Sequence, residues 1–188
     1  MTVSPRRADT RRNHDRILAV AAQSLSRSAD LSFNALAKEA GVGVGTVYRH
    51  FPTPEALILA VYDREVCHLV EVVPDLLESL PPEQAFRTWV TDHLTQYMMT
   101  KRGLADALRL SRPSGSGELP RHAYEQLVAA VDRLLRANIA AGTVRPDLTT
   151  ATLLRGLGGL LYLRPDDDWK RQAGELVDLL WGGMRTGD

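Results

Sequence analysis

The chain has 188 residues with 23 basic and 23 acidic side chains, so its formal net charge is zero. This length allows one substantial hydrophobic core or a small domain joined to a larger one. The charge is unevenly distributed, because residues 1–52 hold eight basic and four acidic side chains and the remainder carries the matching acidic excess. The asymmetry favours a negatively charged partner that contacts one end of the molecule.

Cysteine content and hydropathy indicate the compartment. Cys67 is the one cysteine, so an intrachain disulfide is impossible, and this favours a reducing environment. No apolar run has the length of a membrane span, and the arginine-rich N-terminus lacks the apolar core of a signal peptide. We therefore expect a cytoplasmic protein without a membrane partner.

The N-terminal residues 1–12 lack apolar periodicity and contain Pro5, which predicts a flexible basic arm. Such an arm is either a solvated tail or a segment that lies along phosphates or in the minor groove of DNA. The side chains that would make these contacts are Arg6, Arg7, Arg11 and Arg12. From residue 13 to residue 27 apolar residues recur at helical spacing, so a first helix is predicted there.

Two short helices joined by a tight turn are predicted over residues 31–51. Ser32 is a good N-cap for the first, and Gly41 can end it because glycine accepts positive φ without a Cβ clash. The apolar residues form one inward-facing set, namely Leu36, Ala40, Val42, Val47 and Phe51. Residues 13–52 would then form a three-helix domain whose last helix has the polar outer face of a helix-turn-helix that enters the DNA major groove. Ser32 and Asn34 are additional candidates for phosphate contacts.

Residues 40–51 read AGVGVGTVYRHF, which resembles the DNA-binding motif of the TetR family of bacterial transcriptional regulators. The resemblance extends from about residue 16 to residue 66. Gly43 departs from it, since the family usually has Ser or Thr there, and so does Pro54, where the family usually has a phosphate-contacting Lys. By the family's pattern, Val44, Gly45 and Arg49 face base edges, while the DNA backbone or the groove wall is contacted by Thr46, Tyr48 and His50.

Beyond residue 52 the pattern is helical and shows neither strands nor repeats. One helix begins at Thr53, with Pro54 at its first position and Glu55 near the positive end of the dipole, and is expected to end before Pro74. Further helices are predicted over residues 83–99, 104–110, 121–141, 149–163 and 167–185, with a flexible loop over residues 113–120. The prediction is an all-α protein of about nine helices, with residues 53–188 forming a ligand-binding and dimerisation domain.

Polar side chains fall on apolar faces of two of these helices. His93 and Tyr97 share a face with Trp89, and Asn138 lies in an apolar row on the helix that also carries Tyr124. Each could find a partner in the core, since buried polar groups are normally hydrogen-bonded. Together they favour a mostly apolar cavity for a small, largely apolar molecule. The resemblance likewise implies an effector site in this part of the chain.

The last two helices are apolar around much of their circumference, and the first of them contains Gly156, Gly158 and Gly159. Glycine inside a helix costs about 1 kcal/mol relative to alanine, which a close helix crossing would explain. These helices could bury inside the monomer, but a helix-turn-helix protein reads two half-sites as a two-fold dimer. The resemblance implies dimerisation through these helices, and we expect the interface to include Leu157, Gly158, Leu161, Val177, Leu180 and Trp181.

Patterns for enzymatic chemistry are weak. Glu65 and His68 have the spacing of half a di-iron site, but no other histidine follows a glutamate by three residues. A glycine-rich phosphate loop after a strand is also missing from the sequence. We expect no catalytic residue, metal site or cofactor.

The sequence thus predicts a homodimeric, TetR-like repressor that binds a palindromic operator in double-stranded DNA and is released by a small molecule. One alternative is a DNA-binding regulator without a small-molecule effector. Another is a helical ligand-binding or di-metal protein whose N-terminal motif is vestigial.

Overall fold

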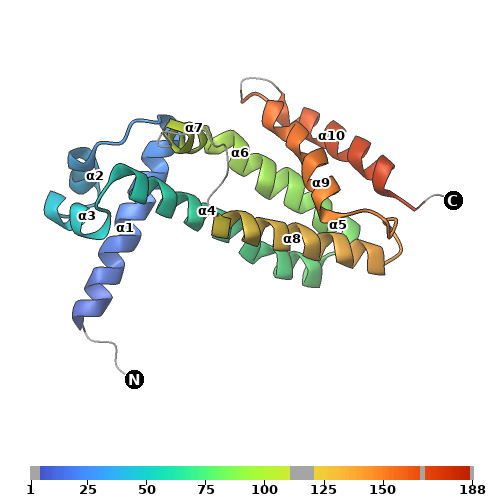
Figure 1. The fold of residues 1–188 in the computed structure, drawn as a ribbon, viewed down its shortest axis with the longest axis horizontal. Helices are drawn as coiled ribbons and strands as arrows, with labels where there is room; N and C mark the ends of the chain where they lie inside the picture. Colours follow the sequence, from blue (N-terminus) through green and yellow to red (C-terminus); the bar gives the residue numbers. More distant parts are fainter. Residues whose placement is uncertain (1–4, 111–120, 166–167, 187–188) are drawn as a thin grey trace. The chain divides into compact units, whose positions relative to one another are not determined.

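The computed structural model describes residues 5–110, 121–165 and 168–186 (Figure 1). The chain forms two compact units, one comprising residues 1–64 and 101–120, the other residues 65–100 and 121–188. Helix α4, Pro54–Ser79, contributes to both. The unit that contains the helix-turn-helix therefore extends beyond the predicted domain of residues 13–52.

Helix α1 spans Pro5–Arg27 and begins earlier than predicted. The expectation of a flexible arm is wrong for residues 5–12, and residues 1–4 lie outside the described part of the chain. Proline is tolerated in the first turn of a helix, and arginine and alanine are strong helix formers. Pairs one turn apart support this segment: Arg12 pairs with Asp9, and Arg16 Nη2 donates to Asn13 Oδ1 at 2.6 Å.

In the first unit, α1 packs against α2 (Phe33–Glu39) and α7 (Arg102–Leu110), and α2 packs against α3 (Val44–His50) (Figure 1). The sequence placed the helix at residues 104–110 in the C-terminal domain, whereas the structure places α7 against α1. Gly103 permits this close packing, because a Cβ added there would lie 2.1 Å from the carbonyl oxygen of Leu25. Only a residue without a side chain fits at this distance.

Helix α4 continues through Pro74, where the sequence predicted its end. Proline inside a helix removes a backbone donor and crowds the preceding turn. The segment around it is nonetheless apolar and packed, since Val73 is buried and Leu76 and Leu77 contact the core of the second unit. Burial of these side chains offsets the cost of the proline.

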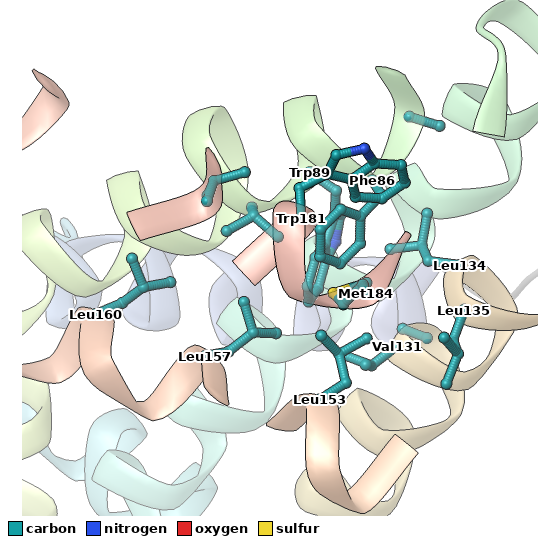
Figure 2. Packing of buried hydrophobic residues seen from close by; sticks show 14 of the residues in the cluster. Phe86, Trp89, Val131, Leu134, Leu135, Leu153, Leu157, Leu160, Trp181 and Met184 are labelled. Carbon is teal, nitrogen blue, oxygen red and sulfur yellow. The ribbon is translucent and has the colours of Figure 1, made fainter. Parts of the chain in front are cut away.

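The second unit is completed by α5 (Pro82–Thr88), α6 (Gln96–Thr100), α8 (Arg121–Ala140), α9 (Thr150–Leu157) and α10 (Trp169–Met184). Figure 2 shows Phe86, Trp89 and Trp181 gathered in its core with Leu134 and Met184 beside them. The ring centroids of Phe86 and Trp181 are 5.6 Å apart. A 3₁₀ segment, η2 (Gly158–Tyr162), extends α9.

A π-helical segment, η1 (Trp89–Thr95), joins α5 to α6 and changes which residues are buried. After Trp89 and Val90 the next buried positions are Thr95 and Met99, because a π-turn holds more residues than an α-turn. Thr95 Oγ1 donates to the carbonyl oxygen of Val90 at 2.7 Å, five residues earlier. The side chains at positions 93 and 97, placed on the apolar face by an α-helical period, are half-exposed instead.

When contiguous helical segments are counted once, the described residues form nine helices and no strand. The predicted all-α fold is confirmed. Within the same ranges, no helix has the length and apolar character needed to cross a membrane.

Candidate nucleic-acid interface

Local signals in the sequence account for the geometry of the helix-turn-helix. Ser32 Oγ accepts a hydrogen bond from the backbone N–H of Ala35 at 3.4 Å and so caps α2. Gly41, at φ 65°, ends that helix, and the Val42 N–H then donates to the Ala37 carbonyl at 2.9 Å. Gly43 precedes α3 without a side-chain cap, as the departure from the family's pattern requires. Two helices are thus held at a tight turn.

The outer face of α3 carries side chains that are unusual for a solvated surface. Val44 is 39% exposed and Tyr48 is 54% exposed, and Arg49 is exposed beside them. Outside α3 itself, none of the described residues comes within 4 Å of the position a Cβ on Gly45 would take, so the backbone is open there. The remaining predicted members of this face, Thr46 and His50, are half-buried. An open backbone with apolar, aromatic and guanidinium groups around it can contact base edges and phosphates.

Phe33 positions Tyr48 on this face. Phe33 is 7% exposed, and its ring centroid lies 4.9 Å from that of Tyr48 at an interplanar angle of 55°. The contact restricts the rotamers of an otherwise exposed ring. Sequence reasoning missed Phe33, although an aromatic residue directly after the N-cap of α2 was a usable signal.

His50 lies at the C-terminal end of α3, where α1 packs on it. Its ring centroid is 5.7 Å from that of His14, whose own ring contacts Phe51 at 5.1 Å. Burial lowers the pKa of His50 below its usual 6.5, and the neighbouring His14 and Arg49 lower it further. His14 was a second residue that the sequence pattern did not reveal.

This environment makes the stability of the first unit depend on pH. The unfolded chain binds a proton at His50 more readily than the folded chain, so the free energy of unfolding should fall as pH drops below 6.5. We expect urea unfolding between about pH 5 and pH 8 to show this loss in the native chain. His50→Gln should remove part of the slope, and an unchanged slope would contradict the assignment.

The other predicted contact residues lie on α1 and at the start of α2. Ser32 and Asn34 are exposed, as are Arg11 and Arg12 in the N-terminal half of α1. The side chains of Arg6 and Arg7 lie outside the described part of the structure. The exposure of these side chains does not show that they contact DNA, so these contacts stay predictions.

Arg16 is a further basic residue at this face that the sequence did not single out. It is exposed, and its Nη1 lies 4.0 Å from the position a Cβ on Gly41 would take. The Arg16 guanidinium on α1 thus lies beside the turn between α2 and α3.

Two protein-family models match the chain and identify its family. The family model described as bacterial regulatory proteins, tetR family, matches residues 17–61. The model described as the C-terminal domain of SbtR-like transcriptional regulators matches residues 81–186, more than half of the chain. The chain belongs to the TetR family. It is a TetR-type transcriptional regulator with a DNA-binding and a ligand-binding domain.

Solved TetR-family structures are similar to almost the whole chain. The regulator SCO0520 from Streptomyces coelicolor is 38% identical with a TM-score of 0.74, over 93% of this chain and 99% of that one. A TetR transcription regulatory protein from Mycobacterium vanbaalenii is 31% identical with a TM-score of 0.74, over 97% and 100%. The chain also matches the HTH-type transcriptional regulator SAR0097 of Staphylococcus aureus (strain MRSA252), with 30% identity over 114 residues. That match spans 59% of either protein's length.

The structure does not support the predicted effector pocket of this TetR-family chain. Asn138 is 1% exposed, and its Nδ2 donates to the carbonyls of Pro82 and Leu134, both at 2.9 Å. Its Oδ1 accepts from Thr143 Oγ1 at 3.0 Å, so the prediction that it orients a ligand is wrong. The indole N–H of Trp89 donates to the carbonyl of Leu69 at 2.8 Å. Of the other predicted members, Tyr124 is 46% exposed and the remaining two are half-exposed, namely His93 and Tyr97.

Half of the predicted dimer-interface residues belong to the core of the monomer. Leu157, Val177 and Trp181 are buried in the second unit (Figure 2 labels the first and last), because helices that are apolar all round also supply their own core. Leu180 packs within the chain, since a Cβ on Gly156 would meet its Cδ2 at 2.8 Å. The predicted close crossing therefore occurs at Gly156, inside the monomer.

Exposed apolar side chains remain on η2 and α10. Leu161, one of the predicted interface residues, is 71% exposed, and among the described residues outside its own helix none comes within 4 Å of a Cβ on Gly158. Tyr162 and Leu179, which the sequence did not single out, are 88% and 73% exposed. We call Leu161, Tyr162 and Leu179 the C-terminal apolar patch.

Proposed function

We propose that this TetR-family chain is a cytoplasmic, homodimeric repressor that reads a palindromic operator through α3 and is released by a small molecule. The observation that carries the proposal is the open outer face of α3. Arg49 can donate two hydrogen bonds to guanine O6 and N7, and Val44 can contact a thymine methyl group. Tyr48, held by Phe33, suits a phosphate contact, which positions the helix without reading sequence.

Basic side chains beside α3 support the same orientation on DNA. The exposed guanidinium of Arg16 lies next to the turn, and Arg11 and Arg12 continue the basic line along α1. Phosphate contacts of this kind supply affinity that falls with salt concentration. Arg16 thereby offers the DNA a cation in a chain that has Pro54 in place of the family's usual lysine.

Substitutions on α3 separate base reading from phosphate contact. Arg49→Ala should weaken the free energy of operator binding by about 1–3 kcal/mol and relax the base preference at one base pair of each half-site. Tyr48→Phe should weaken binding to all sequences alike, because phosphate contacts carry no sequence information. Both variants would be measured by fluorescence anisotropy against single-base changes of a site selected from random duplexes.

The matched control is Arg109→Ala on α7, an exposed arginine of the same unit outside the α3 face. It should bind the whole panel as the native chain does. A uniform loss of affinity in Arg49→Ala would contradict its assignment as a base reader.

The C-terminal apolar patch favours association with a second copy of the chain. If these three large, mostly exposed apolar side chains lie together, they form the kind of apolar surface that marks a protein interface. A two-fold dimer would bury them and present two copies of α3 to half-sites about 34 Å apart.

Charges placed in the patch should therefore break the dimer. We expect Leu161→Asp combined with Leu179→Asp to sediment as a monomer at micromolar concentration, with operator affinity lost while helical content is kept. Glu175→Gln, an exposed change on α10, serves as the control. A native chain that sediments as a monomer would refute the dimer.

Effector release is the remaining part of the proposal. A bound molecule changes DNA affinity only if it binds one conformation of the protein more tightly than another. Helix α4 belongs to both units and is one element through which such a preference can act. A regulator without an effector is the alternative, and loss of operator binding on adding a small molecule separates the two. The di-metal alternative has no support, because the described ranges bring no three metal-ligating side chains together.

A further inference from the structure

A pocket of about 310 Å³ lies in the second unit, at the junction of η1 and α6 with the first turns of α10. It has the volume of a small-molecule site at the lower end of the usual range. None of its lining residues belongs to the α3 face or to the predicted effector pocket. They are Thr91, Asp92, Gln96, Trp169, Lys170 and Ala173.

The π-helical segment builds one wall of this pocket. Its wide turn buries Thr95 and leaves Asp92 and Gln96 on the outer side, toward α10. Segments of this kind recur at functional sites, because they re-aim side chains that an α-helix would place elsewhere. Thr91 Oγ1 lies 3.0 Å from both the Arg87 carbonyl oxygen and Asp92 Oδ1, and its one hydrogen can be donated to either.

The opposite wall is joined firmly to the first. Arg87 donates to Asp178 Oδ1 on α10 at 2.5 Å and lies 5.4 Å from the centroid of the Trp181 ring. The end of α5 is thereby held against α10, so the two walls keep their separation. Ala173, 1% exposed, forms a small floor that leaves room above it.

The charged side chains that line the pocket indicate which kind of ligand it can bind. Asp92 contributes a carboxylate and Lys170 an ammonium, and within the described ranges neither forms an ion pair. Lys170 Nζ lies 5.6 Å from the ring centroid of Trp169. Opposite charges that line one pocket are complementary to a molecule that carries both charges itself. The indole of Trp169 adds a flat apolar surface.

We propose that this pocket binds a small aromatic zwitterion, of the class of aromatic α-amino acids. Its ammonium group pairs with Asp92, its carboxylate with Lys170, and its ring contacts Trp169. The amide of Gln96 is available for a further hydrogen bond. The proposal does not depend on DNA binding.

Calorimetry on the full chain without DNA tests the site, with L-phenylalanine as the probe. Phenethylamine and 3-phenylpropionate each lack one charge and should bind at least about tenfold more weakly. Asp92→Asn should lower the affinity for L-phenylalanine about tenfold and leave that for 3-phenylpropionate unchanged. Lys170→Gln should also lower the affinity for L-phenylalanine about tenfold, but it should leave the affinity for phenethylamine unchanged. Glu175→Gln, on α10 but outside the pocket, should bind as the native chain does.

Several results would overturn the proposal. These are no heat with any probe, equal affinity for all three probes, or affinity for L-phenylalanine that neither variant changes. Each variant would first be shown to melt at the native temperature, which both surface positions should allow. A chain that binds the zwitterion but no operator would refute the proposed function and keep this site.

Discussion

Replacing Gly103 by alanine is expected to destabilise the first unit by about 3 kcal/mol or more. The new Cβ would lie 2.1 Å from the Leu25 carbonyl oxygen and 3.1 Å from the carbonyl carbons of Leu25 and Ser28. All three are backbone atoms, which cannot rotate away as a side-chain end can. Helix α7 must then move off α1 and expose Leu104 and Leu108. Urea unfolding followed by circular dichroism measures the loss.

Gly45→Ala in the same unit is the matched control. Its Cβ would meet no described residue outside α3 within 4 Å, so the change should stabilise α3 by about 0.5–1 kcal/mol. If Gly103→Ala unfolds at the same urea concentration as the native chain, the close packing of α7 on α1 is wrong.

Asn138→Leu should destabilise the second unit by about 2–4 kcal/mol. The amide joins α8 to the Pro82 carbonyl at the start of α5 and to Thr143 in the turn after α8. Leucine has a similar size but makes none of these hydrogen bonds. Thr143→Val removes one hydrogen-bond donor to the same amide, so it should lower the free energy of unfolding by about 1 kcal/mol. Equal stability of Asn138→Leu and the native chain would show that the hydrogen-bonded junction contributes nothing.

Local features of the chain could be predicted because their causes are local. Ser32 caps α2 and Gly41 ends it by interactions within a few residues, so the sequence was enough to locate the helix-turn-helix. The extent of α1 was underestimated, since Pro5 was taken as a helix breaker rather than as a residue of the first turn.

Features that depend on tertiary packing could not be predicted in the same way. An α-helical period placed His93 on the apolar face, but the π-segment shifts burial to Thr95. The apolar residues of α9, η2 and α10 gave no sign of which ones fill the monomer core, as Trp181 does, and which stay exposed, as Leu161 does. Asn138 was expected to face a cavity and instead bonds to a carbonyl 56 residues away in the chain.

The central claim is that α3 reads a specific DNA sequence as part of a two-fold dimer. Selection of binding sites by the native chain from a pool of random duplexes tests it most directly. We expect an inverted repeat with half-site centres about 10 base pairs apart, or a multiple of that spacing, bound at least about 10³-fold more tightly than a scrambled duplex. Recovery of no common sequence, or of a site that the Arg49→Ala chain selects unchanged, would contradict it.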